Sequence, residues 1–204
     1  MNDTPQEAVV QSVAFDLGNG SKIELQYGKA GEHASNRQCG TCSACCRLLP
    51  VPEIGKPGQQ RCRHQRARQP CCAIYGQEFF PRSCASWSCR WLVDPDFHLP
   101  RPDRAHYVVD ILPDSIAVTE DSRVHHVPVV QIWIDPDHRD AHRDPRLRAW
   151  LAEVGRTMGM AAIVRDDAKP GPGLVLIPPC MSQTGDFLEK KAQLGKGAGL
   201  WGRP

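Results

Sequence analysis

Cysteine is the residue type in this sequence with the clearest chemical potential. The 204-residue chain contains ten cysteines, and nine of them lie between Cys39 and Cys89. The densest run, residues 39–46, has the pattern CxxCxxCC. Two thiolates separated by two residues can hold one ion in a tight turn, because this spacing lets both sulfurs face inward while backbone N–H groups point at them. The run therefore predicts a site in which thiolates bind metal.

The adjacent pair Cys45-Cys46 indicates that more than one ion is bound, because neighbouring side chains diverge and seldom serve one tetrahedral ion without backbone strain. Two closed four-cysteine zinc sites would use eight of the nine clustered cysteines, a three-zinc cluster with bridging thiolates would use all nine, and one [4Fe–4S] cluster would use four. Soft ligands restrict the metal to zinc, iron–sulfur or copper(I), because magnesium and calcium prefer oxygen. The number of thiols does not choose among these alternatives.

The N-terminus and the hydropathy bear on the redox state of these thiols. Residues 1–7 have neither the basic nor the apolar region of a secretory signal peptide. No uninterrupted apolar stretch approaches the roughly 20 residues that a membrane-spanning helix requires. We therefore expect a cytoplasmic protein without a membrane partner, in which clustered thiols are metal ligands or redox groups rather than disulfides.

Further cysteine motifs follow the first run at defined intervals. They are Cys62, Cys72-Ala73-Ile74-Tyr75, Pro81-Arg82-Ser83-Cys84 and Ser88-Cys89-Arg90-Trp91-Leu92. Together with CxxCxxCC, over roughly residues 37–92, these motifs resemble the YkgJ-type cysteine-cluster family. That family is described as a zinc- or iron-chelating domain and is often labelled an iron–sulfur oxidoreductase. The strand-rich region after Pro102 is similar to the C-terminal part of its longer bacterial members.

The resemblance implies a set of eight ligands. Carried over residue by residue, the family pattern assigns metal binding to Cys39, Cys42, Cys45, Cys46, Cys62, Cys72, Cys84 and Cys89. Cys71 is additional to the pattern, so it stays open whether Cys71, Cys72 or both face a metal. The resemblance implies metal binding and supplies no reaction.

Closed thiolate sites favour a structural role for the metal, because no coordination position remains for activating water. We expect two or three zinc ions and a metal-stabilised binding or interaction module, with a protein or a small molecule as its partner. An iron–sulfur redox protein or oxidoreductase using the same cysteines is the alternative, and metal storage or delivery is a further one. The sequence has no phosphate-cradling glycine loop and no G-x-S-x-G motif, so it predicts no catalytic residues.

The charge balance argues against a nucleic-acid scaffold. With 25 Lys+Arg against 23 Asp+Glu, the formal net charge is only +2. A local basic run without an acidic residue contains Lys56, Arg61, Arg63, His64, Arg66 and Arg68. It lacks the interleaved aromatic residues typical of nucleic-acid binding, so a nucleic-acid partner has weak support. The favoured interpretation is that arginines offset the negative charge of the thiolate sites, namely Arg47, Arg61, Arg63, Arg82 and Arg90.

A second crowded polar segment precedes the helix predicted from Pro145. It contains Asp135, Asp137, His138, Asp140 and His142. The two histidines have the i,i+4 spacing of a metal pair, but a nearby proline and the surrounding charges predict a solvated loop.

Four further side chains have expected structural roles. Cys180 lies far from the other cysteines and is expected to be an ordinary buried thiol. Trp87, Trp91 and Tyr75 are expected to pack over the cysteine sites and to limit the access of water.

The elements that must position these residues divide the chain into four parts. Residues 1–36 hold a predicted hairpin, with strands over 9–17 and 21–27 around a Gly18-Asn19-Gly20 turn. Residues 37–92 are poor in apolar side chains and lack a sustained period, so bound metal would supply the missing cross-links. Residues 93–182 are interpreted as an α+β scaffold packed on that segment, and residues 183–204 as a weakly ordered tail.

The scaffold has recognisable strands and one helix. Strands are expected over 106–112, 115–120, 127–135, 161–165 and 174–177. The first two are separated by a predicted turn at Pro113-Asp114. Asp144 caps the expected helix, Pro145 suits its first position, and Gly159 ends it. The predicted fold class is α+β, with an irregular cysteine-rich metal-binding segment braced by a small mixed or antiparallel sheet and one amphipathic helix.

Overall fold

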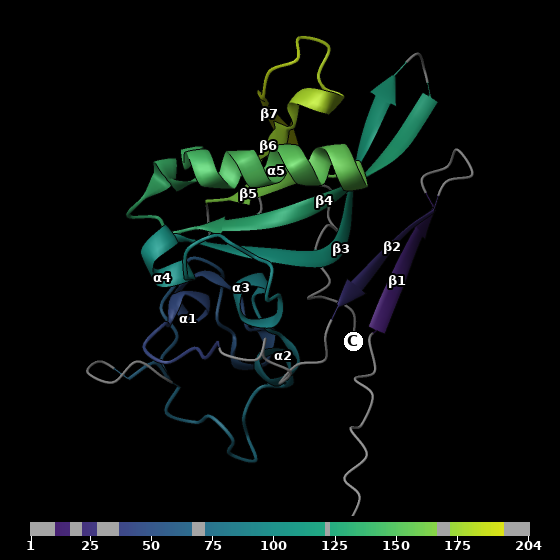
Figure 1. Cartoon of the computed structure of the whole chain (residues 1–204). Helices are drawn as coiled ribbons and strands as arrows, with labels where there is room; N and C mark the ends of the chain where they lie inside the picture. Colours follow the sequence, from purple (N-terminus) through teal and green to yellow (C-terminus); the bar gives the residue numbers. More distant parts are fainter. Residues whose placement is uncertain are drawn as a thin grey trace, which may run out of the picture.

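The computed structural model describes residues 11–16, 22–27, 37–66, 72–120, 123–166 and 172–193. Within these ranges the chain forms a two-stranded ribbon, a five-stranded mixed sheet, one long helix and several short helices (Figure 1). The predicted α+β class is confirmed. In the same ranges no helix is long and apolar enough to cross a membrane.

The N-terminal ribbon matches the predicted hairpin. Strands β1 (Gln11–Asp16) and β2 (Lys22–Tyr27) pair antiparallel, and their register places Asp16 opposite Lys22. The predicted Gly18-Asn19-Gly20 turn lies outside the described residues.

The larger sheet has the strand order β3-β4-β5-β6-β7. Its strands are β3 (Tyr107–Glu120), β4 (Arg123–Ile134), β5 (Ala161–Arg165), β6 (Pro172–Ile177) and β7 (Leu188–Gln193). Strands β4 and β5 are parallel, and the other neighbouring pairs are antiparallel. Val129, Val130, Ile132 and Ile163 are fully buried, because both faces of these central strands are covered.

Two parts of the sheet differ from the prediction. The expected turn at Pro113-Asp114 is wrong: β3 continues through it, with a register shift between Asp110 and Asp114. Proline has no backbone N–H to donate to the ladder, and a bulge accommodates it without ending the strand. The predicted weak order of residues 183–204 is also wrong for 188–193, which pair with β6 as an edge strand. Its polar sequence, LEKKAQ, gave little sign of a strand, since edge strands commonly carry charge.

The long helix α5 (Pro145–Met158) has the predicted boundaries. The Asp144 side chain accepts a hydrogen bond from the Arg146 backbone N–H at 2.9 Å, and Gly159 ends the helix with φ +62°. Leu147, Leu151 and Val154 of α5 are buried in the main hydrophobic core against the sheet.

The other described helices are short and lie mostly in the cysteine-rich segment. They are α1 (Ala44–Leu48), η1 (Pro52–Ile54), α2 (Arg82–Ser86), α3 (Arg90–Val93), α4 (Pro102–Ala105), η2 (Arg139–Arg143) and η3 (Pro179–Met181). Figure 1 shows α5 on one side of the sheet and α1, α2 and α3 on the other. The long helix and the cysteine-rich segment therefore form separate layers on the central sheet.

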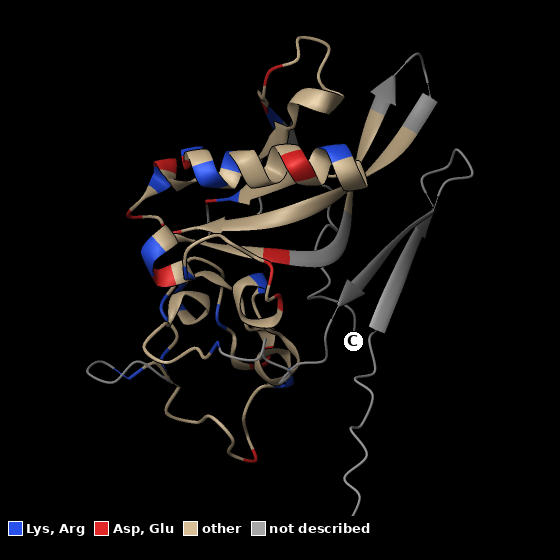
Figure 2. Cartoon of the chain, viewed as in Figure 1, with Lys and Arg blue, Asp and Glu red and all other residues tan. Residues whose placement is uncertain are grey.

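Successive residues of β3 point to these two layers. Val109 belongs to the core with α5, whereas Val108 packs with Leu48, Leu49 and Trp133 beneath the cysteine-rich segment. Charged side chains lie along α5, while β4 carries none among its described side chains (Figure 2). The sheet is thus a mainly apolar support for the cysteine-rich segment, in which Asp110 of β3 and Gln131 of β4 are buried polar side chains.

Candidate metal centre

The eight predicted ligands come from short helices and the loops between them. Cys39 and Cys42 precede α1, and Cys45 and Cys46 lie in it. Cys62 and Cys72 lie in loops, Cys84 lies in α2, and Cys89 is the N-cap residue of α3. None of these eight cysteines forms a disulfide. The ninth clustered cysteine, Cys71, lies outside the described residues.

Cys39, Cys42, Cys45 and Cys89 form a first group of thiols. Burial raises the pKa of Cys89 to about 12, and the nearby thiolates of Cys39 and Cys42 add to that effect. The pKa of Cys45 is raised in part by Cys39 and Cys89. The four thiols thus interact electrostatically with one another, and Cys39 also interacts with Cys46. Cys42, Cys45 and Cys89 also pack against the same apolar cluster beneath β3 and β4.

Backbone donors are directed at the first group. The N–H groups of Ala44 and Asp103 donate to the Cys42 sulfur, and the N–H of Leu92 donates to the Cys89 sulfur. Such bonds stabilise the thiolate, which is the form that binds metal. The expected arrangement of inward sulfurs with N–H groups pointing at them is present for these two cysteines.

Cys46, Cys62, Cys72 and Cys84 form a second group. Burial raises the pKa of Cys84 to about 11, and the thiolates of Cys46, Cys62 and Cys72 raise it further. The Cys62 N–H donates to the Cys46 carbonyl at 2.8 Å, which joins two members through the backbone. An isolated β-bridge between Gln65 and Cys72 brings Cys72 back beside the segment that follows Cys62.

The adjacent residues Cys45 and Cys46 belong to different groups. They lie in α1, where consecutive side chains are rotated by about 100° around the helix axis. A hydrogen bond between the two thiols lowers the pKa of Cys46 to about 7, with Lys56 contributing in the same direction. The same bond raises the pKa of Cys45. The two groups are therefore neighbours that meet at this pair.

The thiol ligands of both groups suit a soft metal ion, but their sulfur atoms are farther apart than in a metal-bound site. In the described part of the chain, no three cysteine sulfurs lie within 4.8 Å of one another. A zinc ion holds each sulfur at about 2.3 Å, so the side chains must converge when it binds. Buried indole N–H groups of Trp87 and Trp133, which lie at the first group, have no hydrogen-bond partner among the described residues. They are donors that thiolates of a metal site would satisfy.

The cations closest to the thiols differ from those predicted. Lys56 is buried at the second group, where its pKa is lowered by burial and raised by Cys62, Cys46 and other thiolates. Arg101 lies at the first group, near Cys42 and Cys39. Arg47 and Arg90, predicted to offset thiolate charge, form ion pairs with aspartates, as Arg101 does with Asp103. Nearby aspartates compete with the thiolates for these arginines. The spacing of residues along the chain does not reveal this competition.

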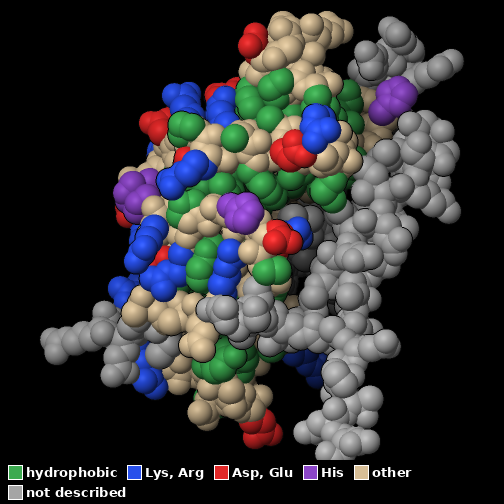
Figure 3. Space-filling model, viewed as in Figure 1, with side chains coloured by type: hydrophobic (Ala, Val, Ile, Leu, Met, Phe, Trp, Pro, Cys, Tyr) green, Lys and Arg blue, Asp and Glu red, His purple; other side chains and the backbone are tan. Residues whose placement is uncertain are grey.

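The basic run does not form a single surface. Lys56 is buried, whereas Arg61 and Arg63 are exposed, and Arg68 lies outside the described residues. On the face seen in Figure 3, Lys and Arg side chains are interspersed with acidic and hydrophobic ones. The arrangement adds no support for a nucleic-acid partner.

The expected aromatic shell is confirmed for one of its three members. Trp87 packs beside the first group, but Trp91 packs against the main core and Tyr75 is 73% exposed. The prediction for Cys180 is wrong as well, because this thiol is exposed in η3. The Pro-Pro sequence before it places it on the surface of α5 rather than inside the core.

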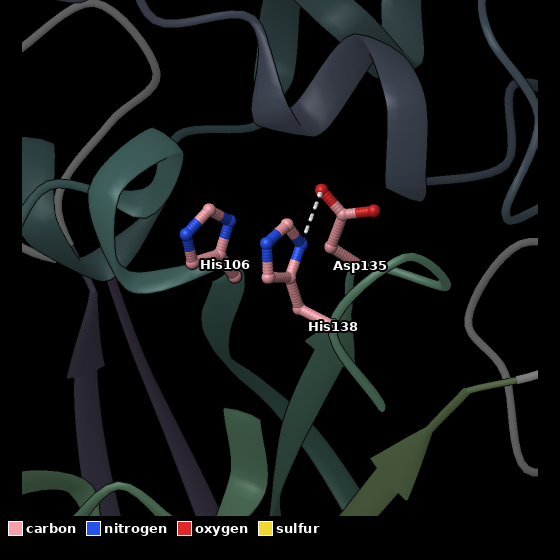
Figure 4. Close-up of side chains that lie close together, drawn as sticks. All are labelled: His106, Asp135 and His138. Atoms are coloured by element: carbon pink, nitrogen blue, oxygen red, sulfur yellow. Dashed lines mark ion pairs between the residues drawn. The ribbon is translucent and has the colours of Figure 1, made fainter. Parts of the chain in front are cut away.

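The polar segment before α5 matches the predicted solvated loop only in part, because Asp137, His138 and Asp140 are exposed and the remaining two residues are not. Asp135 and His142 are buried, and residues 139–143 form η2. His138 does not pair with His142; its ring stacks on that of His106, with 3.5 Å between ring centroids. His106, Asp135 and His138 each offer a ligand atom within 4.8 Å of the others (Figure 4). Sequence reasoning missed His106, because the false turn at Pro113 concealed that β3 starts where β4 ends.

Comparison with known proteins does not add a relationship. No protein-family model, no curated protein and no solved structure matches this chain. The resemblance to the YkgJ-type family therefore stays a prediction, and the function has to be argued from the site.

Proposed function

We propose that this chain binds two metal ions in two four-thiolate sites and that zinc is the metal. One site comprises Cys39, Cys42, Cys45 and Cys89, and the other comprises Cys46, Cys62, Cys72 and Cys84. Each site offers four soft ligands, the number that closes the tetrahedral shell of structural zinc.

The observation that carries this proposal is the division of Cys45 and Cys46 between the two groups. A cluster with shared thiolates would place all sulfurs around a common centre. Here the second group has its own backbone connection through Cys62, and the buried Lys56 interacts with three of its thiols, Cys46, Cys62 and Cys84, but with only Cys45 of the first group. Two separate ions therefore account for the arrangement better than three bridged ones.

The metal would hold a segment that has little core of its own. Among the described residues of this segment, Ala44, Leu48 and Leu49 are the buried members of the apolar cluster beneath the sheet, and Cys42, Cys45, Trp87 and Cys89 pack against it partly buried. Thiolate-bound ions would supply cross-links that burial does not provide. The loop between Cys72 and Cys84 exposes Tyr75 and Phe79, side chains of the kind that interaction surfaces use. We therefore propose a metal-stabilised interaction module.

Metal analysis of the anaerobically purified full-length protein tests the proposal. We expect a colourless protein with two zinc ions per chain. The Cys89→Ser variant should lose one ion and Cys84→Ser the other, whereas the matched control Cys180→Ser, at an exposed thiol outside both groups, should lose neither.

Each other outcome contradicts a part of the proposal. A brown protein that contains sulfide would show that the cysteines hold an iron–sulfur cluster instead of zinc. Loss of both ions in Cys89→Ser and in Cys84→Ser, with the fold retained by circular dichroism, would show one shared cluster instead of two sites. Transfer of the ions to a chelator within seconds would favour metal storage or delivery over a structural role.

A further inference from the structure

Two histidines and one aspartate meet where β3 begins and β4 ends. One ligand atom from each of His106, Asp135 and His138 lies within 4.8 Å of the other two. Figure 4 shows the nitrogen-bearing edges of both rings and the carboxylate directed to the same side. From this geometry we infer that the three residues bind one divalent first-row transition-metal ion, such as Zn²⁺ or Fe²⁺, separately from the thiolates. Two imidazoles and one carboxylate are a donor set that these ions accept.

The backbone brings the three positions together. Asp135 N–H donates to the His106 carbonyl at 2.9 Å, which extends the β3–β4 register by one residue beyond the pair Tyr107–Ile134. The His138 N–H donates to the Asp135 carbonyl at 2.8 Å, and this turn returns the His138 ring to the strand end. His106 itself caps α4 with φ +61°, a left-handed conformation that non-glycine residues adopt rarely and mainly for a local reason.

The carboxylate of Asp135 is held in one orientation. Its Oδ1 accepts from Arg47 Nη2 at 3.1 Å and from the Asp137 N–H at 3.1 Å. Its Oδ2 faces His138 Nδ1 at 3.8 Å. Metal-binding carboxylates are commonly fixed in this way, with one oxygen hydrogen-bonded to the protein and the other directed at the ion. Burial of Asp135 restricts it further.

The local charge favours a cation. Arg47 Nη2 also donates to Asp137 at 3.0 Å, so two carboxylates face one guanidinium and the group is net negative when both imidazoles are neutral. The histidine rings stack 13° from parallel, and imidazole binds metal in its neutral form.

The site differs from the thiolate sites in having open positions. Stacked rings project their nitrogen lone pairs in parallel, so one ring must rotate for both to reach the same ion. His138 has room to do so, because its side chain is 48% exposed. Three protein ligands leave at least one coordination position for water or for an oxygen of a bound ligand.

A titration of the full-length protein with Zn²⁺ tests this inference. Any empty thiolate sites of the purified protein are first saturated with zinc, and the ring signals of ¹⁵N-histidine are then followed by NMR as further zinc is added. We expect the signals of His106 and His138 to shift together and to saturate at one added ion per chain. The signal of the exposed His98 is expected to stay unchanged.

Calorimetric titration of two variants completes the test. His138→Ala should weaken the binding of the added ion more than about tenfold, whereas the control His98→Ala should bind it as the wild type does. His138 is exposed, so its removal should leave the fold intact. Failure of the histidine signals to respond, or equal binding by both variants, would overturn the inference. Because the thiolates are filled beforehand and the readout is at histidine, failure of this inference is distinguishable from failure of the proposed thiolate sites.

Discussion

The guanidinium of Arg47 donates a hydrogen bond of 3.1 Å to the buried carboxylate of Asp135. Arg47 directly follows Cys46 in α1, and Asp135 directly follows β4. This contact joins the cysteine-rich segment to the strand end that carries the His-Asp-His group. The two candidate metal regions are therefore parts of one packed unit.

Replacement of Arg47 by alanine should destabilise the protein by about 1 kcal/mol. This value is at the upper end of the range measured for ion pairs at the protein surface. The arginine side chain is 41% exposed, which screens the interaction, but the Asp135 end is buried and would lose a donor. Urea unfolding measures the change. The control Arg143→Ala removes the ion pairs of a 60% exposed arginine with Asp140 and Glu189 and should cost within about 0.5 kcal/mol. Equal effects of the two variants would mean that the contact of Arg47 with Asp135 stabilises the fold no more than an exposed ion pair does.

Lys56→Met should weaken the second thiolate site more than the first, because Lys56 interacts with Cys46, Cys62 and Cys84 of the second and with Cys45 alone of the first. The Lys56 ammonium donates to the Leu49 carbonyl and, at 3.3 Å, to the Pro57 carbonyl, while it faces the thiolates of Cys62 and Cys46. Its loss leaves buried acceptors unpaired, at a cost of about 1–3 kcal/mol. Competition with a chelator, followed by native mass spectrometry, would count the ions released. Lys190→Met, at an exposed position of β7, is the control, and release of both ions together from Lys56→Met would contradict the expectation.

Removal of the thiolate-bound metal should loosen the cysteine-rich segment and spare the central sheet. The main core combines the sheet with α5 and contains no cysteine among its described members, whereas the cluster beneath the sheet includes Cys42, Cys45 and Cys89 at its edge. Hydrogen exchange measured by mass spectrometry after chelation should show lost protection over residues 39–92 and retained protection in β4 and β5. Uniform loss would indicate that the sheet cannot fold without the metal, and uniform protection that the metal does not support this segment.

Acid should weaken the cap of α5 through Asp144. Partial burial raises the pKa of Asp144, but hydrogen bonds from Arg146 and Tyr107 outweigh it, and the net pKa is below the ordinary value of 3.8. The folded state therefore binds this proton more weakly than the unfolded state does. The resulting stabilisation is complete above pH 3.8 and is lost as the pH falls through the lowered pKa.

Asp144→Asn isolates this contribution, because asparagine keeps a capping oxygen without the charge. Urea unfolding of both proteins across the acid range should give a stability difference that is larger above pH 3.8 than below the lowered pKa. Both proteins lose thiolate-bound metal in acid alike, so only their difference reports on Asp144. Parallel stability curves would contradict the expected role of the carboxylate.

Local patterns were sufficient to predict several elements. The helix from Pro145 to Met158 was predicted with its cap and its end, because capping, proline placement and apolar periodicity act within a few residues. Strand β5 was predicted with its exact range for the same reason, since its run of apolar residues is short and continuous. The clustering of the cysteines and their soft chemistry were also evident from residue type and spacing alone.

The partition of the cysteines and the pairing of His106 with Asp135 depended on the fold. Both arise from residues far apart in the chain, which meet because β3 passes through its bulge without turning and because α1 directs Cys45 and Cys46 to different sides. The burial of Lys56 and the ion pairs of Arg47 with aspartates also depend on residues that are distant in the chain. Short-range preferences choose helices, strands and ligand types, but the geometry of a site depends on which distant side chains the packed layers bring into contact.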